Sequence, residues 1–198
     1  MSVIKIIIGS TRPSRFGATF GTWFSSVAAE YAVSNPSGPH FETVDLADLA
    51  LPLLDEAVPA SMKKYEHDHT KRWSKIVDEA DGFVFIAPEY NHGMSGALKN
   101  AIDYLFYEWN YKPAAFASYG GGAGGVRAVE QLRQVMGELK VYDIRESVLV
   151  PNYWGQFDAK GTFQATEDQR KAVLAMLAQL AYWTEAMKAP RQALAAKA

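Results

Sequence analysis

The chain has 198 residues, of which 48% are hydrophobic and 21% charged, and its formal net charge is −2. These values are ordinary for a soluble globular protein, and they give no electrostatic reason to expect a nucleic acid or an anionic membrane as partner. Cysteine is absent, which excludes disulfides, thiolate metal sites, iron–sulfur clusters and cysteine nucleophiles.

Neither a secretory signal nor a membrane-spanning segment is predicted. The apolar run at the N-terminus covers only residues 3–8, and no stretch approaches the roughly 20 apolar residues of a spanning helix. We therefore expect a cytoplasmic protein with no membrane insertion. Length and the lack of repeats or linkers predict one domain over residues 1–188. Residues 189–198 carry no core pattern and are expected to form a disordered tail.

Five strands are predicted along the chain. Residues 3–8 and 82–87 are apolar runs without alternation, as expected of strands covered on both faces. Residues 41–46 alternate between apolar and polar, which indicates a strand nearer the sheet edge. Residues 113–118 and 142–150 complete the set.

Five helices alternate with these strands. Apolar stripes at helical spacing run through residues 20–31, 67–80, 97–109 and 129–139. Thr166 and Gln169 form a plausible capping box that opens a last helix, which extends to about residue 188. Residues 49–66 show no sustained period and predict a long excursion over the carboxyl edge of the sheet, where such loops are usually functional.

The alternation predicts an α/β fold with a parallel, doubly wound sheet and right-handed crossovers. With five strands, a flavodoxin-like three-layer sandwich in the order 2-1-3-4-5 is favoured. Its ligand crevice lies where the first and third strands are neighbours. The loops after strands one (9–17), three (88–96) and four (118–125) then converge at one edge.

The loop after the first strand is rich in groups that bind anions. It carries the hydroxyls of Ser10, Thr11 and Ser14 and the guanidinium groups of Arg12 and Arg15. It leads into a helix N-terminus, which offers free N–H donors and a partial positive charge. We predict a terminal phosphate here, although not through a Walker A loop; the alternative is a solvated loop whose hydroxyls only cap the helix.

The loop after the third strand begins Pro88-Glu89-Tyr90-Asn91-His92-Gly93. A tyrosine beside an asparagine at a strand end is typical of a ligand platform, and a core aromatic is the alternative for Tyr90. Glu89 is a candidate acid or base, but a lone carboxylate beside an aromatic is more often a hydrogen-bonding group. His92 has no metal-ligand partner at a recognised spacing. We predict a ligand-holding edge rather than acid–base or metal chemistry.

Glycines crowd the loop after the fourth strand, where Gly120-x-Gly122-x-x-Gly125 formally matches the dinucleotide-binding fingerprint. That fingerprint normally follows the first strand of its unit and needs an acidic residue at the end of the next strand. Asp143 and Glu146 lie at about that distance. The glycines equally suit the close approach of a flat ring to the backbone, and a flexible loop is a third possibility.

Two other patterns predict little chemistry. His67, Asp68 and His69 crowd the start of one helix, where a solvated helix start is favoured over a metal site. No serine stands in a G-x-S-x-G elbow, so a hydrolase triad has no support. No metal site is expected.

Three blocks resemble the NADPH-dependent FMN reductase family, flavodoxin-like oxidoreductases that include quinone, chromate and azo-dye reductases. The first is Gly9-Ser10-Thr11-Arg12-Pro13, and the last is Ser118-Tyr119-Gly120-Gly121. The middle block is the most specific: Pro88-Glu89-Tyr90-Asn91, followed by Gly96-Ala97-Leu98-Lys99-Asn100-Ala101-Ile102-Asp103. The resemblance covers about residues 1–150.

The resemblance implies a bound FMN whose parts are held by these blocks. Its phosphate would be held by Ser10, Arg12 and the amides of Arg15, Phe16 and Gly17. The isoalloxazine ring would be lined by Pro88, Glu89, Tyr90 and Asn91, with main-chain N–H groups near its pyrimidine edge. The other side of the ring would be closed by Ser118, Tyr119, Gly120 and Gly121. Oriented donors at that edge stabilise the negative charge of the reduced ring.

The same resemblance implies ping-pong hydride transfer from NADPH or NADH through FMN to a quinone-like or other small acceptor. The cofactor carries the chemistry, so no catalytic acid or base is predicted. Members of the family are usually homodimers or homotetramers, and the aromatic segment Tyr104–Tyr111 would serve that contact or fill the core. Residues 49–66 and Trp154–Phe157 are expected to shape the acceptor pocket.

Two alternative functions stay open on sequence alone. A flavodoxin-type electron carrier would share the fold without a pyridine nucleotide site, although flavodoxins are usually strongly acidic and this chain is near neutral. A Rossmann-type NAD(P) dehydrogenase would use the glycines of residues 120–125. Reduction of a bound flavin by NADPH would distinguish the reductase from the electron carrier. A protein that binds no flavin would favour the dehydrogenase.

Overall fold

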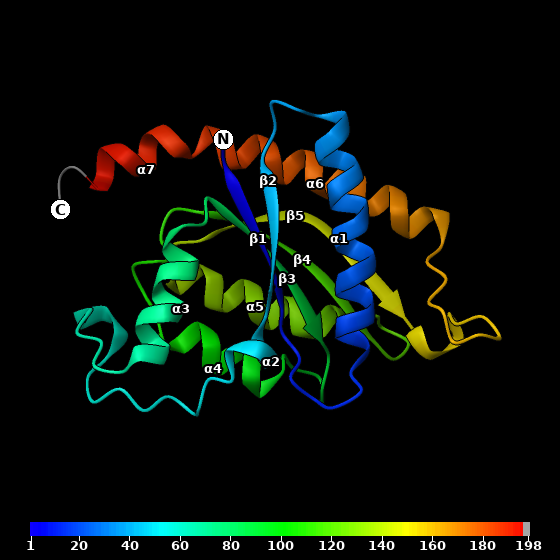
Figure 1. The fold of residues 1–198 in the computed structure, drawn as a ribbon, viewed down its shortest axis with the longest axis horizontal. Coiled ribbons are helices and arrows are strands. Elements are labelled where there is room, and N and C mark those ends of the chain that lie inside the picture. Colours follow the sequence, from blue (N-terminus) through cyan, green and yellow to red (C-terminus); the bar gives the residue numbers. More distant parts are fainter. Residues whose placement is uncertain (196–198) are drawn as a thin grey trace.

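The computed structural model describes residues 1–195 and shows alternating strands and helices (Figure 1). The strands are β1 (Val3–Ile8), β2 (His40–Asp45), β3 (Gly82–Pro88), β4 (Pro113–Gly120) and β5 (Tyr142–Pro151). The α-helices are α1 (Phe16–Ser34), α2 (Leu46–Leu49), α3 (Asp68–Asp78), α4 (Gly96–Asp103), α5 (Val126–Glu138), α6 (Glu167–Ala186) and α7 (Lys188–Ala195). Two short 3₁₀ turns are η1 (Ala60–Met62) and η2 (Tyr153–Gly155).

These strands form a five-stranded sheet in the order β2-β1-β3-β4-β5, and every pairing is parallel. The predicted flavodoxin-like α/β fold is therefore confirmed. β3 and β4 are buried throughout, whereas the edge strand β2 is only partly covered. The contrast explains why β3 reads as a continuous apolar run and β2 alternates.

Helices cover both faces of the sheet. On one face, Ile4, Ile6 and Val84 pack against α1 and α6, which supply Phe20, Phe24, Val27, Met176, Leu177 and Leu180. On the other face, Ile7, Phe83 and Phe85 pack against α3, α4 and α5, which supply Trp73, Val77, Leu98, Ile102, Leu132 and Met136. This division leaves the carboxyl ends of β1, β3 and β4 together at the lower edge of Figure 1.

Helix α4 is shorter than its apolar stripe predicts. It ends at Asp103, and residues 104–111 continue as turns. The indole N–H of Trp73 donates to the carbonyl of Ala101 at 2.7 Å, and that of Trp109 donates to Ile102 at 3.2 Å. These donors satisfy carbonyls that a longer helix would have used internally. Tyr104 and Trp109 are buried in the core, Phe106 and Tyr111 are half-buried, and Tyr107 is exposed.

The C-terminal tail differs from expectation in part. Residues 188–195 form α7 rather than a disordered segment, and residues 196–198 lie outside the described part of the chain. Arg191 of α7 pairs with Asp81, whose carboxylate also accepts the main-chain N–H of Val3 at 3.0 Å. A charge pair, not an apolar stripe, thus attaches this helix to the amino edge of the sheet. Within residues 1–195, no helix combines the length and apolarity needed to cross a bilayer.

Candidate functional site

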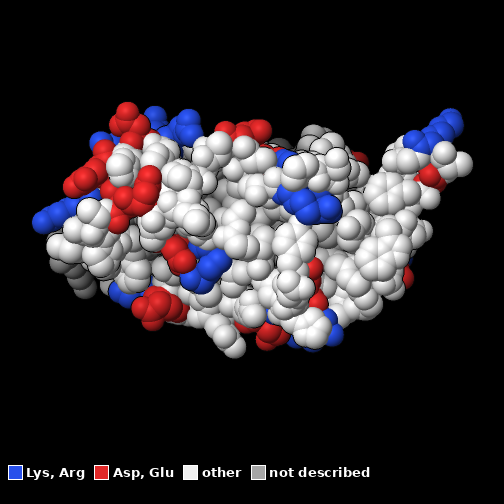
Figure 2. Space-filling model, turned by 90° about the horizontal axis from the view of Figure 1, so that it is seen from below, with Lys and Arg blue, Asp and Glu red and all other residues white. Residues whose placement is uncertain are grey.

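Three loops meet at the carboxyl edge of the sheet, as the sequence predicts. The main-chain N–H of Gly9 donates to Ile86 at 2.9 Å, and that of Glu89 donates to Tyr119 at 3.0 Å. Ser95, the residue that caps α4, donates its hydroxyl to the carbonyl of Gly9 at 2.5 Å. Figure 2 looks onto this edge: its middle is mostly uncharged, with a few basic and acidic side chains, and acidic side chains are more numerous toward the left end.

The first loop presents an open helix N-terminus. Arg15 is the N-cap of α1, and its side chain makes no capping hydrogen bond in the described structure. The first turn of α1 contains no acidic residue, so nothing from the helix itself neutralises the partial positive charge of its amides. This is the arrangement that binds a phosphate at a helix N-terminus.

Hydroxyl groups surround this helix start. Ser10 is fully buried, and its Oγ lies 2.9 Å from the phenolic oxygen of Tyr90. Hydrogen bonding to the Tyr90 side chain also raises the pKa of Arg12, which keeps that guanidinium charged. The hydroxyl of Tyr119 is buried and has no hydrogen-bond partner among residues 1–195. Burial, then the nearby Tyr90, raises the pKa of Tyr119, so its phenol stays protonated.

The two arginines of this loop are used differently. The guanidinium of Arg15 pairs with Asp45, which in turn accepts the main-chain N–H of Ala47 at 3.0 Å as the N-cap of α2. The Arg15 side chain therefore ties the first loop to the end of β2. Arg12 is the guanidinium that stays exposed.

The third loop contains a tight two-residue turn. The main-chain N–H of Tyr90 donates to Gly93 at 2.9 Å, and Gly93 donates back to Tyr90 at 3.0 Å. Asn91 and His92 stand between them with φ of 50° and 67°, the left-handed conformations of a type I′ turn. Within the described chain, the amides of Asn91 and His92 donate to no other group. The turn thus presents two free N–H donors at the strand end.

The Glu89 carboxylate has a structural role at the start of α5. It pairs with the guanidinium of Arg127 at 2.5 Å and accepts the main-chain N–H of Arg127 at 3.0 Å. Burial by itself raises the pKa of Glu89, but these hydrogen bonds and the charge of Arg127 outweigh it, so the pKa lies below its usual range. A carboxylate that stays ionised and caps α5 is a poor general acid.

The glycine-rich fourth loop is fixed rather than flexible. Ser118 donates its hydroxyl to Gly124 at 2.9 Å, and the main-chain N–H of Asn152 donates to Gly120 at 3.0 Å. Gly125 has φ of 92°, and a Cβ there would stand 2.7 Å from the Ser118 side chain. The glycines therefore serve a tight loop, and the Ser118 hydroxyl is used inside it.

The structure does not support a dinucleotide-binding site at the glycines of residues 120–125. Asp143 is the second residue of β5, pairs with Ala114 in the sheet register and contacts Arg133. It therefore lies at the amino end of its strand, opposite the glycine loop. A ribose-binding carboxylate would have to lie at the carboxyl end.

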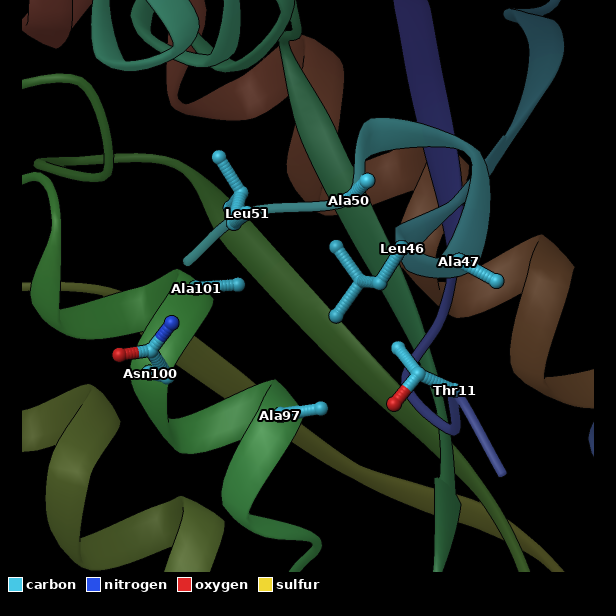
Figure 3. A pocket seen from close by; sticks show the side chains of 8 residues that line it. All are labelled: Thr11, Leu46, Ala47, Ala50, Leu51, Ala97, Asn100 and Ala101. Carbon is cyan, nitrogen blue, oxygen red and sulfur yellow. The ribbon is translucent and has the colours of Figure 1, made fainter. Parts of the chain in front are cut away.

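The excursion after β2 forms a wall beside the first loop. A cavity of about 300 Å³ lies between them and α4, lined by Thr11, Leu46, Ala47, Ala50, Leu51, Ala97, Asn100 and Ala101. Figure 3 shows the Thr11 hydroxyl on one side of this cavity and the α4 alanines on the other. The Asn100 amide fixes the excursion, donating to Pro52 at 2.7 Å and accepting from Leu54 at 2.9 Å. At the far end, His69 contacts Asp55 at 2.9 Å.

Two residues at this edge are not predicted from the sequence. Ser95 joins the first and third loops, and its place directly before α4 is an N-cap signal that could have identified it. Tyr153 stacks on Phe16 with ring centroids 4.3 Å apart, but it follows β5 in an irregular segment with no periodic pattern. Only the folded chain brings it to the start of α1.

Comparisons with known proteins agree on one relationship. Residues 1–155 match the family described as NADPH-dependent FMN reductase. An NAD(P)H-dependent FMN reductase of Schizosaccharomyces pombe is 41% identical over 140 residues, which cover 70% of this chain and 67% of the relative. One of Saccharomyces cerevisiae is 38% identical over 144 residues, covering 70% and 75%. An NAD(P)H:quinone oxidoreductase of Solanum tuberosum is 32% identical over 189 residues, covering 90% and 93%.

A solved structure has the same fold. FerB, a flavoenzyme NAD(P)H:(acceptor) oxidoreductase from Paracoccus denitrificans, superposes with a TM-score of 0.71 at 20% identity, covering 94% of this chain and 99% of FerB. At that identity the likeness concerns the fold alone.

Proposed function

Because the chain belongs to the NADPH-dependent FMN reductase family, we propose that it holds FMN at the carboxyl edge of its sheet and reduces a quinone-like or other small acceptor. The family makes it an NAD(P)H-dependent flavin oxidoreductase of the FMN, quinone and azo reductase type. The observation that carries the cofactor assignment is the Tyr119 hydroxyl, buried without a partner beside the open start of α1.

The residues present suit FMN. A Cβ on Gly17 would stand 2.6 Å from the Tyr119 hydroxyl oxygen, so that unpaired group lies against the first turn of α1. Leaving a buried hydroxyl unpaired costs about 1–3 kcal/mol, a cost that a ligand oxygen bound near the helix start can remove. The phosphate would be held by Ser10, Arg12 and the amides of Arg15, Phe16 and Gly17.

The ring would lie across the third and fourth loops. One side of the ring site would be formed by Pro88, Glu89, Tyr90 and Asn91, and the other by the backbone of Ser118, Tyr119, Gly120 and Gly121. When bound, FMN accepts a hydride from NAD(P)H and passes two electrons to the acceptor. The free N–H groups of Asn91 and His92 would serve as oriented donors to the pyrimidine edge of the ring and would stabilise negative charge there. With Glu89 held ionised by Arg127, no side chain is assigned an acid–base step.

A homodimer or homotetramer is also proposed. Between η1, α4 and α5 lies an open groove of about 610 Å³, lined by Pro59, Ala60, Ser61, Lys99, Ile102, Asp103, Leu105, Phe106, Gln134, Val135, Glu138 and Leu139. Its half-buried Phe106 and Val135 would be covered by a second copy. Light scattering of the purified protein tests this, and Phe106→Glu should lower the measured mass.

The function is tested by purifying the protein with added FMN and mixing it anaerobically with NADPH. We expect the visible absorption band of flavin to co-purify with the chain and to bleach on mixing. A colourless protein that gains no absorbance with FMN would refute the cofactor assignment. A bound flavin that NADPH does not bleach would refute the reductase and favour an electron carrier.

The phosphate assignment has its own test. Arg12→Ala should weaken FMN binding about tenfold or more, because a charged hydrogen bond to phosphate is lost. Arg145→Ala is the matched control, since Arg145 is also exposed but lies in the middle of β5. Arg127 is unsuitable as a control, because it holds Glu89 in the third loop. Equal FMN retention in the Arg12 and Arg145 variants would refute the assignment.

A further inference from the structure

Trp154 is an exposed aromatic side chain next to the glycine-rich loop. It lies in η2, directly after β5, and 62% of its surface is accessible. An aromatic ring is the largest apolar contact a side chain can offer, and exposed aromatics that gather at one place mark binding sites. Phe157, in the same segment, is also exposed. The segment therefore presents apolar area at the edge where the three loops meet.

The turn that carries Trp154 is held in place. The main-chain N–H of Asn152 donates to the carbonyls of Gly120 and Gly121, at 3.0 and 3.2 Å. The ring of Tyr153 stacks on Phe16 and meets the Trp154 ring edge-on, with centroids 5.3 Å apart. A ring that is already positioned loses little conformational entropy when a ligand arrives.

The backbone of Gly121 and Gly122, which carries no side chains, lies beside the Trp154 indole. The indole Cη2 atom is 3.9 Å from the point where a Cβ on Gly121 would stand, and a Cβ on Gly122 would meet no atom within 4 Å. Backbone without side chains allows a flat molecule to approach closely, and the indole provides an aromatic wall at its side. A conjugated planar ring is the ligand that uses both surfaces.

We propose that Trp154 stacks on the planar ring of the electron acceptor and thereby favours aromatic acceptors over compact non-aromatic ones. This inference rests on the proposed function and adds a specificity residue to it. A quinone takes two electrons and two protons from the reduced enzyme and becomes a hydroquinone. Two ferricyanide ions take one electron each instead, and they need no ring contact.

The experiment uses the FMN-loaded enzyme, reduced anaerobically with one equivalent of NADPH and then mixed with menadione or with ferricyanide. Trp154→Ala should lower the rate constant for menadione about three- to tenfold, the range expected for one lost aromatic contact, and leave that for ferricyanide unchanged. Trp154→Phe should keep most of the menadione rate. Tyr182→Ala, which removes a side chain 64% exposed on α6, is the matched control and should change neither rate.

Three results would overturn the inference. Unchanged menadione rates in Trp154→Ala would show that the indole makes no contact with the acceptor. Equal slowing with both acceptors, or loss of FMN, would show that it supports the flavin or the fold. Equal slowing with a lower mass in size-exclusion chromatography would place it against a second copy. If NADPH fails to reduce the wild-type enzyme, the proposed function fails instead, so the two failures are distinguishable.

Discussion

Replacing Tyr119 with phenylalanine should stabilise the protein without FMN and weaken its hold on FMN. The ring would stay packed edge-on against Phe16 and Tyr153, with centroids 5.0 and 5.5 Å away, so the substitution removes only the unpaired hydroxyl. Removing a buried hydroxyl that lacks a partner gains about 1–3 kcal/mol in the free energy of unfolding. For a chain of this size that raises the melting temperature by roughly 2–4 °C per kcal/mol.

Gly17 supplies an internal check on the position of the hydroxyl. A Cβ at Gly17 would stand 2.6 Å from the Tyr119 oxygen, so Gly17→Ala must displace a buried side chain and should cost about 1–3 kcal/mol. In the Tyr119→Phe background that oxygen is gone, and Gly17→Ala should cost much less. The difference is the coupling energy of a double-mutant cycle.

Chemical denaturation of the FMN-free proteins measures both effects, and titration with FMN and with riboflavin measures the second. If the hydroxyl meets the phosphate region, Tyr119→Phe should weaken FMN and leave riboflavin unchanged, since riboflavin carries no phosphate. A lower stability of Tyr119→Phe, or an equal cost of Gly17→Ala in both backgrounds, would refute the reasoning.

Three further predictions concern stability. Glu89→Gln should cost about 1 kcal/mol near pH 7, because Arg127 loses its ionised partner. Since the folded pKa of Glu89 is lowered, the difference from wild type in thermal melts should begin to shrink as pH falls below the ordinary glutamate pKa of about 4.3, and a difference that does not change with pH would contradict this. Lys112 lies directly before β4, and its buried ammonium group donates to the carbonyls of Val77 and Asp78 at the end of α3. Burial lowers its pKa to about 8, so wild type should gain stability relative to Lys112→Met between about pH 8 and 10, and a flat difference in denaturant titrations would contradict this. His92→Val should cost about 1–2 kcal/mol and His92→Gly much less, because φ at this position is positive; equal midpoints for the two variants would argue against the type I′ turn.

The positions of the strands and of most helices follow from local sequence. Runs such as Val3–Ile8 and Gly82–Pro88 specify covered strands by composition alone, and Thr166 with Gln169 does form the capping box that starts α6. Helix ends were less predictable. α4 stops where two indoles take its carbonyls, and α7 forms where Arg191 meets Asp81. Both partners lie far away in sequence, so no local pattern contains them.

The sequence by itself determined which three loops would meet at one edge, because the carboxyl ends of neighbouring parallel strands lie together. Only the tertiary structure decided what each side chain there does. Arg15 is paired with Asp45, Glu89 with Arg127 and the Ser118 hydroxyl with Gly124, while the buried Tyr119 hydroxyl has no partner among residues 1–195. Hydrogen bonding is short-ranged and directional, so these roles depend on distances of a few ångströms between segments that the fold, not the sequence order, brings together.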